Sequence, residues 1–228
     1  MKENLILLHG ALGSKEQLAE LKALLAEAFN VFLLDFSGHG GLEHEGAFSI
    51  DLFVKDTIQL MARHQLPVAH IFGYSMGGYV ALQLAHDHPG RAVKIITLGT
   101  KYSWNPESAA KEVRMMNPDV IEQKIPAFAA SLAVRHQPAD WKSIMKRTAE
   151  MMTGLGAGKA MTAADFASIE NEVLVCIGTD DHMVSIEESE RTAKQLKNGH
   201  LKIIEGFRHP LESVDKNILA SICNEFFL

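Results

Sequence analysis

Six short apolar runs that alternate with helical patterns place the strongest constraint on how this chain can fold. The runs lie at 5–8, 31–34, 68–72, 93–98, 173–177 and 201–204. Each is rich in Ile, Leu and Val without polar alternation, which is typical of strands buried on both faces of a parallel sheet. Helical periodicity occupies 15–29, 51–64, 76–88, 187–197 and 211–227. The order predicts an α/β fold with a mostly parallel sheet of about six strands flanked by helices.

One segment, 102–168, interrupts this alternation. It has no strand pattern, and its helical stretches are separated by Pro106, Pro118, Pro126 and Pro138. We therefore expect a helical cap, or lid, at 102–168, inserted into a core formed by 1–101 and 169–228. The segment contains Met115, Met116, Met145, Met151, Met152 and Met161, and also Trp104, Phe128 and Trp141. These side chains suit ordinary helix packing or an adaptable apolar pocket, and the three aromatic residues are the candidates for a substrate pocket.

Charge and hydropathy argue against two classes of partner. The formal net charge of -6 over 228 residues offers no basic surface of the kind that binds nucleic acid. The first apolar run, 5–8, is far too short for a secretion signal or a membrane span, so we expect no membrane span and a cytoplasmic location. Cys176 and Cys223 both lie in apolar patterns, which predicts two buried thiols and neither a disulfide nor a metal pair.

A Gly-x-Ser-x-Gly motif, Gly73 to Gly77, joins the apolar run 68–72 to the helical pattern 76–88. A serine hydroxyl is a poor nucleophile unless it is exposed on a sharp turn and aimed at a base. The two glycines provide the room that such a turn requires. The motif in this strand-turn-helix context predicts Ser75 as a catalytic nucleophile.

A base and an orienting carboxylate must lie at the same edge of the sheet as Ser75, where parallel strands end. Asp180 and Asp181 follow the run 173–177, and His209 follows the run 201–204. Pro210 restrains the backbone of His209 and so holds this histidine on a defined loop. The order serine, aspartate, histidine predicts a catalytic triad, with either aspartate as its acid.

Four motifs are distributed along the chain: H-G-A-L-G-S at 9–14, D-F-S-G-H-G at 35–40, the Gly-x-Ser-x-Gly motif at 73–77 and G-T-D-D at 178–181. Together they make this chain resemble proteins of the α/β-hydrolase fold over nearly its whole length. The resemblance implies a trimmed version of the fold, because two strands that usually precede the first motif have no counterpart here. The family's spacing selects Asp181 as the acid, with Asp180 as the alternative.

The resemblance also implies a reaction. Ser75 would attack an acyl carbon while His209 takes its proton and Asp181 stabilises the imidazolium. The backbone N–H groups of Ala11 and Met76 would form the oxyanion hole. We expect hydrolysis of a small or medium carboxylic ester through an acyl-enzyme, with a small-molecule acyl substrate and with no cofactor and no metal.

Two other classes of function stay open at this stage. The same triad could serve a C–C bond hydrolase, a thioesterase, or a lyase or synthase, because fold and triad do not determine the chemistry. The chain could also be a ligand receptor that keeps a hydrolase pocket and turns over slowly. Turnover would distinguish an enzyme from a receptor, which should instead bind a ligand tightly and have a protein partner.

Overall fold

The computed structural model describes residues 2–228, and its centre is a six-stranded sheet. The strands are β1 (Glu3–Leu8), β2 (Phe29–Leu33), β3 (Ala69–Tyr74), β4 (Ala92–Leu98), β5 (Glu172–Gly178) and β6 (Asn198–Ile204). All neighbours run parallel, in the order β2-β1-β3-β4-β5-β6, which confirms the predicted sheet. The chain reverses its direction across the sheet between β1 and β3, and such switch points are where α/β sheets bind ligands.

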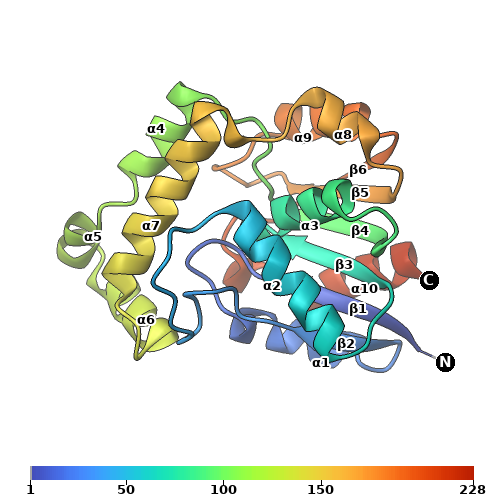
Figure 1. Ribbon diagram of the computed structural model, residues 1–228, viewed down its shortest axis with the longest axis horizontal. Coiled ribbons are helices and arrows are strands. Elements are labelled where there is room, and N and C mark those ends of the chain that lie inside the picture. The colour runs from blue at the N-terminus through green and yellow to red at the C-terminus, as the bar shows by residue number, and fades with distance from the viewer. Residues whose placement is uncertain (1) are drawn as a thin grey trace.

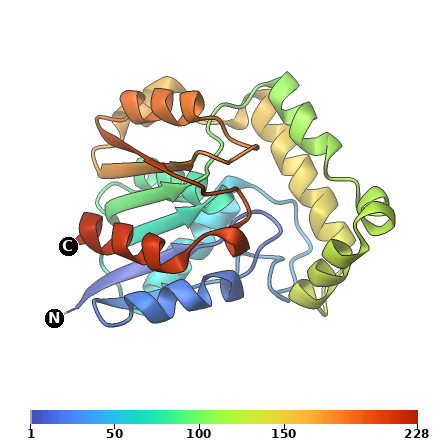
Figure 2. The same ribbon diagram turned by 180° about the vertical axis from the view of Figure 1, so that it is seen from behind.

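Helices cover both faces of the sheet (Figures 1 and 2). On one face lie α2 (Ile50–Arg63), α3 (Met76–Asp87) and α9 (Ile186–Gln195), and on the other lie α1 (Ala19–Leu25) and α10 (Lys216–Phe227). Strand β1 shows why both faces need cover, since Ile6 and Leu8 pack into one core and Leu5 and Leu7 into the other. Alternate residues of a strand point to opposite faces, so a strand covered twice must be apolar throughout.

The segment between β4 and β5 is helical, as predicted. It contains α4 (Pro106–Arg114), α5 (Pro118–Lys124), α6 (Pro126–His136) and α7 (Trp141–Gly154). Three of these helices begin with the prolines that the sequence marks as breaks, because proline fits the first turn, where its missing N–H has no partner to lose. Together they form a layer, called the α4–α7 layer below, beyond the carboxyl ends of the strands (Figure 2).

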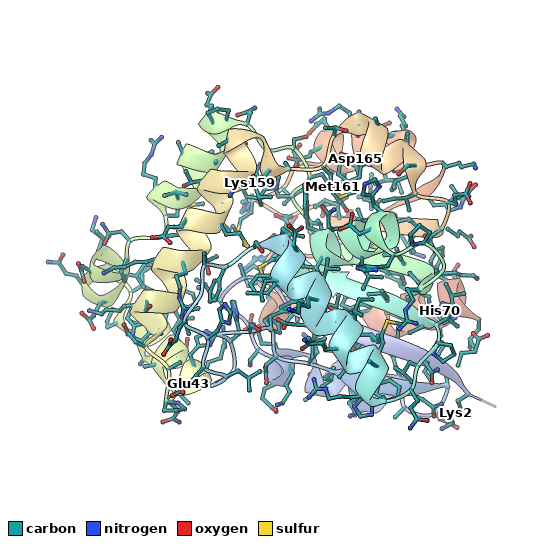
Figure 3. All side chains as sticks on the ribbon, in the orientation of Figure 1. Lys2, Glu43, His70, Lys159, Met161 and Asp165 are labelled. Atoms are coloured by element: carbon teal, nitrogen blue, oxygen red, sulfur yellow. The ribbon has the colours of Figure 1, made fainter. Side chains whose placement is uncertain are left out.

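The last helix of the segment, α8 (Ala163–Ser168), packs on the core instead. It lies against α3 and α9 and buries Phe166. The N–H of Met161, labelled in Figure 3, donates a hydrogen bond of 2.7 Å to the Tyr79 hydroxyl of α3. The α4–α7 layer therefore ends before Met161, and α8 belongs to the layer that covers the sheet.

Two further sequence predictions can be compared with the structure. Cys176 and Cys223 are free and buried, as predicted. The helix predicted at 211–227 is instead a short turn followed by α10 from Lys216, because the Asp215 side chain caps a new helix there. Within residues 2–228, every helix is too short or too polar to cross a bilayer.

Candidate active site

Ser75 occupies a strained turn between β3 and α3. Its φ and ψ are 50° and -115°, in a region that non-glycine residues rarely adopt. A side chain at Gly73 would collide with the backbone of Gly77, and one at Gly77 would collide with the carbonyl of Leu8. The two glycines of the motif are thus required by close backbone approach, which is how this sequence can form the turn.

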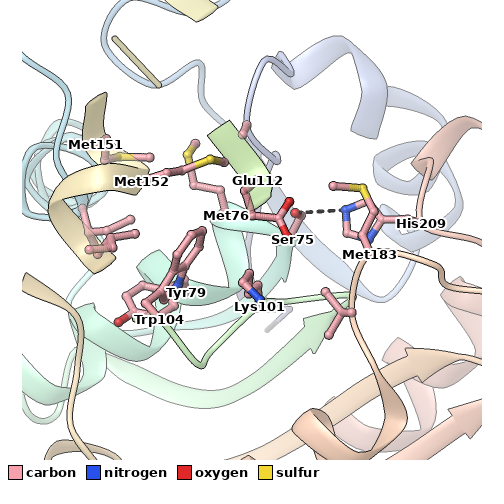
Figure 4. A pocket seen from close by; sticks show the side chains of 14 residues that line it. Ser75, Met76, Tyr79, Lys101, Trp104, Glu112, Met151, Met152, Met183 and His209 are labelled. Atoms are coloured by element: carbon pink, nitrogen blue, oxygen red, sulfur yellow. Dashed lines mark hydrogen bonds between the residues drawn. The ribbon is translucent and has the colours of Figure 1, made fainter. Parts of the chain in front are cut away.

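Ser75, His209 and Asp181 lie in a hydrogen-bonded chain. The Ser75 Oγ is 3.2 Å from His209 Nε2, drawn as a dashed line in Figure 4, and His209 Nδ1 is 2.8 Å from Asp181 Oδ2. A carboxylate can only accept, so the ring proton is on Nδ1 and the lone pair of Nε2 faces the serine. Asp180 is half-buried and accepts a hydrogen bond from the Thr179 hydroxyl, so of the two candidate acids only Asp181 contacts His209.

The Asp181 carboxylate is fixed by three hydrogen bonds. Burial by itself would raise its pKa, but the hydrogen bond from His209 and the backbone N–H groups of Met183 and Val184 hold the pKa below its usual value. Those two N–H groups donate to Oδ1 at 2.8 and 2.9 Å, which leaves Oδ2 for the imidazole. The loop after β5 therefore supplies a charged acceptor in one orientation.

Two backbone N–H groups in the lining of the cavity beside Ser75 are candidates for binding negative charge. Ala11 follows β1, Met76 begins α3, and both line the cavity that contains Ser75. Within residues 2–228, neither N–H donates a hydrogen bond to another protein group. The first N–H groups of a helix carry partial positive charge, so Met76 suits an anion at this position.

Hydrogen bonds from the α4–α7 layer fix the loop that carries Ala11. Leu12 has a φ of 57°, and its carbonyl accepts hydrogen bonds from Arg135 Nη1 at 2.9 Å and from His136 Nε2 at 3.0 Å. The other ring nitrogen of His136 accepts from the Gly40 N–H at 3.2 Å. The end of α6 thus fixes the loop after β1, a contact that the sequence does not indicate.

Three buried imidazoles lie under this loop. The ring centroids of His9 and His39 are 5.3 Å apart, and those of His39 and His136 are 5.7 Å apart. Burial lowers the pKa of His9 to about 4 and holds the pKa of His39 well below its usual value. The pKa of His136 is also lowered, again chiefly by burial. The cluster is therefore neutral at pH 7, and His9 has a structural place, with hydrogen bonds to Gly10 and Phe36.

Two cavities meet at Ser75, with empty volumes of about 510 and 1170 Å³. The smaller, inner cavity includes Met76, Tyr79, Trp104, Met151, Met152 and Leu155 in its lining. The larger, outer cavity includes Met115, Met116, Ile121, Ile125, Phe128 and Met145. Of the predicted pocket residues, Trp104 faces the inner cavity and Phe128 the outer one. Trp141 lines neither, because it packs within the core between helices.

Four charged residues of the cavities were missed by sequence analysis, namely Lys101, Glu112, Arg135 and Glu212. Lys101 lines the inner cavity and forms an ion pair of 3.7 Å with Glu188. Glu112 of α4 lines both cavities and is only 6% exposed. It lies three residues after Ala109, on the buried face of the helix. The signal available in the sequence was that Glu112, a charged residue, occupies a position on the face of the helix that is otherwise buried.

The sequence and the fold are both similar to those of known hydrolases. The family described as "Serine aminopeptidase, S33" matches residues 1–216. The chain is similar to "Putative carbamate hydrolase RutD" of Caulobacter segnis, with 26% identity over 219 residues, 86% of this chain and 80% of the relative. It also resembles the solved structure of the 2-hydroxy-6-oxo-6-phenylhexa-2,4-dienoate hydrolase BphD from Rhodococcus sp. strain RHA1, with a TM-score of 0.79, 22% identity, and 99% and 90% of the two chains covered.

A second solved structure gives the same result for the fold. The enol-lactonase from Burkholderia xenovorans LB400 aligns with a TM-score of 0.77 and 19% identity, over 100% of this chain and 92% of that one. The α/β-hydrolase resemblance read from the four motifs is thereby confirmed. Because the matched region 1–216 takes in all six strands, the turn at Ser75 and His209, this chain belongs to the serine aminopeptidase S33 family of the α/β-hydrolase superfamily.

Proposed function

We propose that this protein is a serine hydrolase that cleaves small or medium carboxylic esters through an acyl-enzyme. The observation that carries the proposal is the chain from Ser75 Oγ through His209 to Asp181, on a serine whose backbone is held in the strained turn. Such strain is retained where the surrounding structure enforces it, and it is concentrated at functional sites. The free N–H groups of Ala11 and Met76 beside the serine support the same role.

The proposed reaction proceeds in two balanced steps. Ser75 Oγ bonds to the acyl carbon while His209 Nε2 takes the hydroxyl proton, and the carbonyl oxygen becomes an oxyanion facing Ala11 and Met76. The ester C–O bond then breaks, and His209 returns the proton to the departing alcohol. Water next gives a proton to His209 and its oxygen to the acyl carbon. Release of the carboxylic acid restores the Ser75 hydroxyl with that proton.

The size and lining of the cavities support a compact, mostly apolar substrate. In this proposal the α4–α7 layer is the cap, and the inner cavity beneath it accepts one side of the ester. Methionine side chains from α7 adapt to irregular shapes, so they would accommodate related acyl groups. The outer cavity, which includes Phe128, would accept the other side of the ester.

Relatives with other substrates define the competing chemistries. The similar protein from Caulobacter segnis is named for carbamates, and the Rhodococcus structure for 2-hydroxy-6-oxo-6-phenylhexa-2,4-dienoate. A substrate panel should therefore include carbamates, thioesters, lactones and a C–C bond substrate besides esters. The ester proposal requires that simple esters give the highest kcat/KM in this panel.

Labelling with a fluorophosphonate tests the nucleophile without knowledge of the substrate. We expect intact mass and peptide mapping to show one adduct, on Ser75, that is lost in Ser75→Ala and in His209→Ala. Turnover of esters by the wild-type protein above the level of Ser75→Ala would then support the hydrolase. A folded wild-type protein that takes no label and turns over no ester would contradict the proposal and favour a binding role.

Gly99 offers a finer test of the triad geometry. It follows β4 with a φ of 59°, and a Cβ there would lie 3.1 Å from Asp181 Oδ2 and 3.3 Å from His209 Nδ1. Because alanine would shift this pair by a few tenths of an ångström, we expect Gly99→Ala to lower kcat roughly tenfold. The left-handed backbone should also cost about 1 kcal/mol of unfolding free energy.

Gly90→Ala is the matched control for Gly99→Ala. Gly90 has a φ of 83°, but a Cβ there meets nothing within 4 Å. It should lose a similar unfolding free energy in urea titrations and keep the wild-type kcat and the wild-type rate of fluorophosphonate labelling. Equal losses of kcat in the two variants would mean that backbone strain, and not contact with the triad, explains the effect.

A further inference from the structure

The loop that carries Ala11 contains a β-turn that its own sequence disfavours. The Gly13 N–H donates to the Gly10 carbonyl at 3.1 Å, which closes a turn with Ala11 and Leu12 at its centre. Leu12, the third residue of the turn, has a φ of 57°. Turns with a positive φ at this position usually place glycine or asparagine there, because a Cβ makes the left-handed conformation unfavourable. The turn therefore needs support from outside the loop.

Support for this turn comes from the carboxyl end of α6, in the α4–α7 layer (Figure 1). The Leu12 carbonyl accepts hydrogen bonds from Arg135 Nη1 at 2.9 Å and from His136 Nε2 at 3.0 Å. His136 is buried, and the Arg135 hydrogen bond is charge-assisted, which makes it the stronger of the two. Arg135 also pairs at 3.2 Å with Glu212, in the short turn after His209. One guanidinium thus joins the loop after β1 to the segment that follows the candidate base.

The conformation of this turn matters for catalysis because the loop lies directly against the nucleophile. A Cβ built at Gly10 would lie 3.2 Å from the Ser75 Cβ, so the backbone just before Ala11 is packed on Ser75. The Ala11 N–H is one of the two proposed donors to the oxyanion, and such donors are effective only when they already point at the developing charge. A change of Leu12 to negative φ would rotate the peptide group between Ala11 and Leu12 and would disturb this donor.

We propose that Arg135 and His136 are positioning residues that hold the Leu12 turn in its left-handed form, so that docking of α6 on this loop sets the rate of the chemical step. This inference rests on the hydrolase function proposed above. Neither side chain takes part in the bond changes, which Ser75 and His209 carry out. Without the two donors from α6, the relaxed turn would predominate, and the oxyanion would lack one of its two N–H groups for most of the time.

Arg135→Met tests the positioning role, because it removes the charged donor and keeps an apolar stem. We expect kcat for the best ester to fall about tenfold, as the loss of a charge-assisted hydrogen bond predicts, while KM changes less than about threefold. Arg114→Met is the matched control, since it makes the same change at an exposed arginine of α4 in the same layer. It should keep the wild-type kcat, because surface substitutions outside a network have small effects.

Leu12→Gly distinguishes support of the turn from general packing of the α4–α7 layer. Glycine adopts positive φ about as readily as negative φ, so the turn should no longer depend on the donors from α6. The measured quantity is the loss of kcat caused by Arg135→Met in each of two backgrounds. We expect a loss of about tenfold in the wild-type background and of less than about threefold in the Leu12→Gly background. A loss within about twofold in the wild-type background, or equal losses in the two backgrounds, would overturn the inference.

Fluorophosphonate labelling separates a failure of this inference from a failure of the hydrolase proposal. The phosphoryl oxygen of the reagent needs the same N–H donors when Ser75 attacks, but no ester has to be turned over. If the wild-type protein is labelled on Ser75 and hydrolyses no ester, the ester proposal fails, and labelling rate constants of the wild type, the two single variants and the double variant replace kcat. A loss of about tenfold in Arg135→Met that Leu12→Gly removes would still support the positioning role. If Ser75 takes no label in any of the four proteins, the inference is overturned together with the hydrolase proposal.

Discussion

Asp181→Asn is expected to lower kcat by about ten-thousandfold without disturbing the fold, the effect that the same change has in other Ser-His-Asp enzymes. The reason is specific to the surroundings of this side chain. Oδ1 accepts from the N–H groups of Met183 and Val184, so an asparagine would keep its carbonyl oxygen there and turn its NH₂ toward His209 Nδ1. Nδ1 would then become the acceptor, and the proton would move to Nε2, where it faces Ser75 and cannot accept the hydroxyl proton.

The rate constant for fluorophosphonate labelling of Ser75 and the kcat for the best ester both measure this loss. Asp180→Asn is the matched control, because it makes the same chemical change one residue earlier, on a half-buried side chain that makes no hydrogen bond with His209. It should keep activity within about twofold, since His209 Nδ1 keeps its hydrogen bond to Asp181 in this variant. A large loss of activity in Asp180→Asn, or near-normal activity in Asp181→Asn, would show that Asp181 is not the acid of the triad.

The central strands could be predicted because burial on both faces demands uninterrupted apolar sequence. In β3 every residue is buried, and the run 68–72 indicates the strand clearly. The edge strand β6 was predicted only at 201–204, although it begins at Asn198. Its first residues are exposed or half-buried, so their sequence contains no apolar signal. Thus prediction was good where the environment is uniform and incomplete where one side of the strand faces solvent.

The same limit applies to the candidate site. Ser75 could be predicted because the turn places backbone demands on Gly73 and Gly77 that are local in sequence. Glu112 and His136 could not be assigned, since their positions depend on how the α4–α7 layer docks at the edge of the sheet. Trp141 shows the opposite error, because an aromatic residue in that layer serves equally well for packing between helices. Local motifs therefore predict the groups proposed to react, whereas the residues that line the candidate pocket can be assigned only from the tertiary structure.

Acid is expected to destabilise this protein well above the range in which carboxylates titrate. The folded-state pKa of His9 is about 4 because of burial, and the pKa values of His39 and His136 are also lowered. Smaller effects on His9 come from Asp35, which raises its pKa, and from Arg135, which lowers it. As the pH falls below about 6.5, the unfolded chain binds protons that the folded chain cannot accept. The contribution of these neutral imidazoles to the unfolding free energy is therefore fully present above about pH 6.5 and is lost as the pH falls toward 4. The loss from His9 alone is about 2 kcal/mol at pH 5.

Urea unfolding between pH 7.5 and pH 5 measures this loss, and His39→Phe tests its origin. The His39 ring stacks on Phe48, and its Nε2 has no hydrogen-bond partner in the part of the chain that the structure describes, so phenylalanine should pack in its place. The variant should lose less unfolding free energy than the wild type on going to pH 5, because one buried group that resists protonation is gone. His200→Gln, at an exposed histidine of β6, is the control, because it removes an imidazole that lies outside the buried cluster. Carboxylates such as Asp181 affect the pH dependence of the unfolding free energy mainly below about pH 5. An unfolding free energy that stays constant between about pH 7.5 and pH 5 would therefore mean that the buried imidazoles become protonated without penalty.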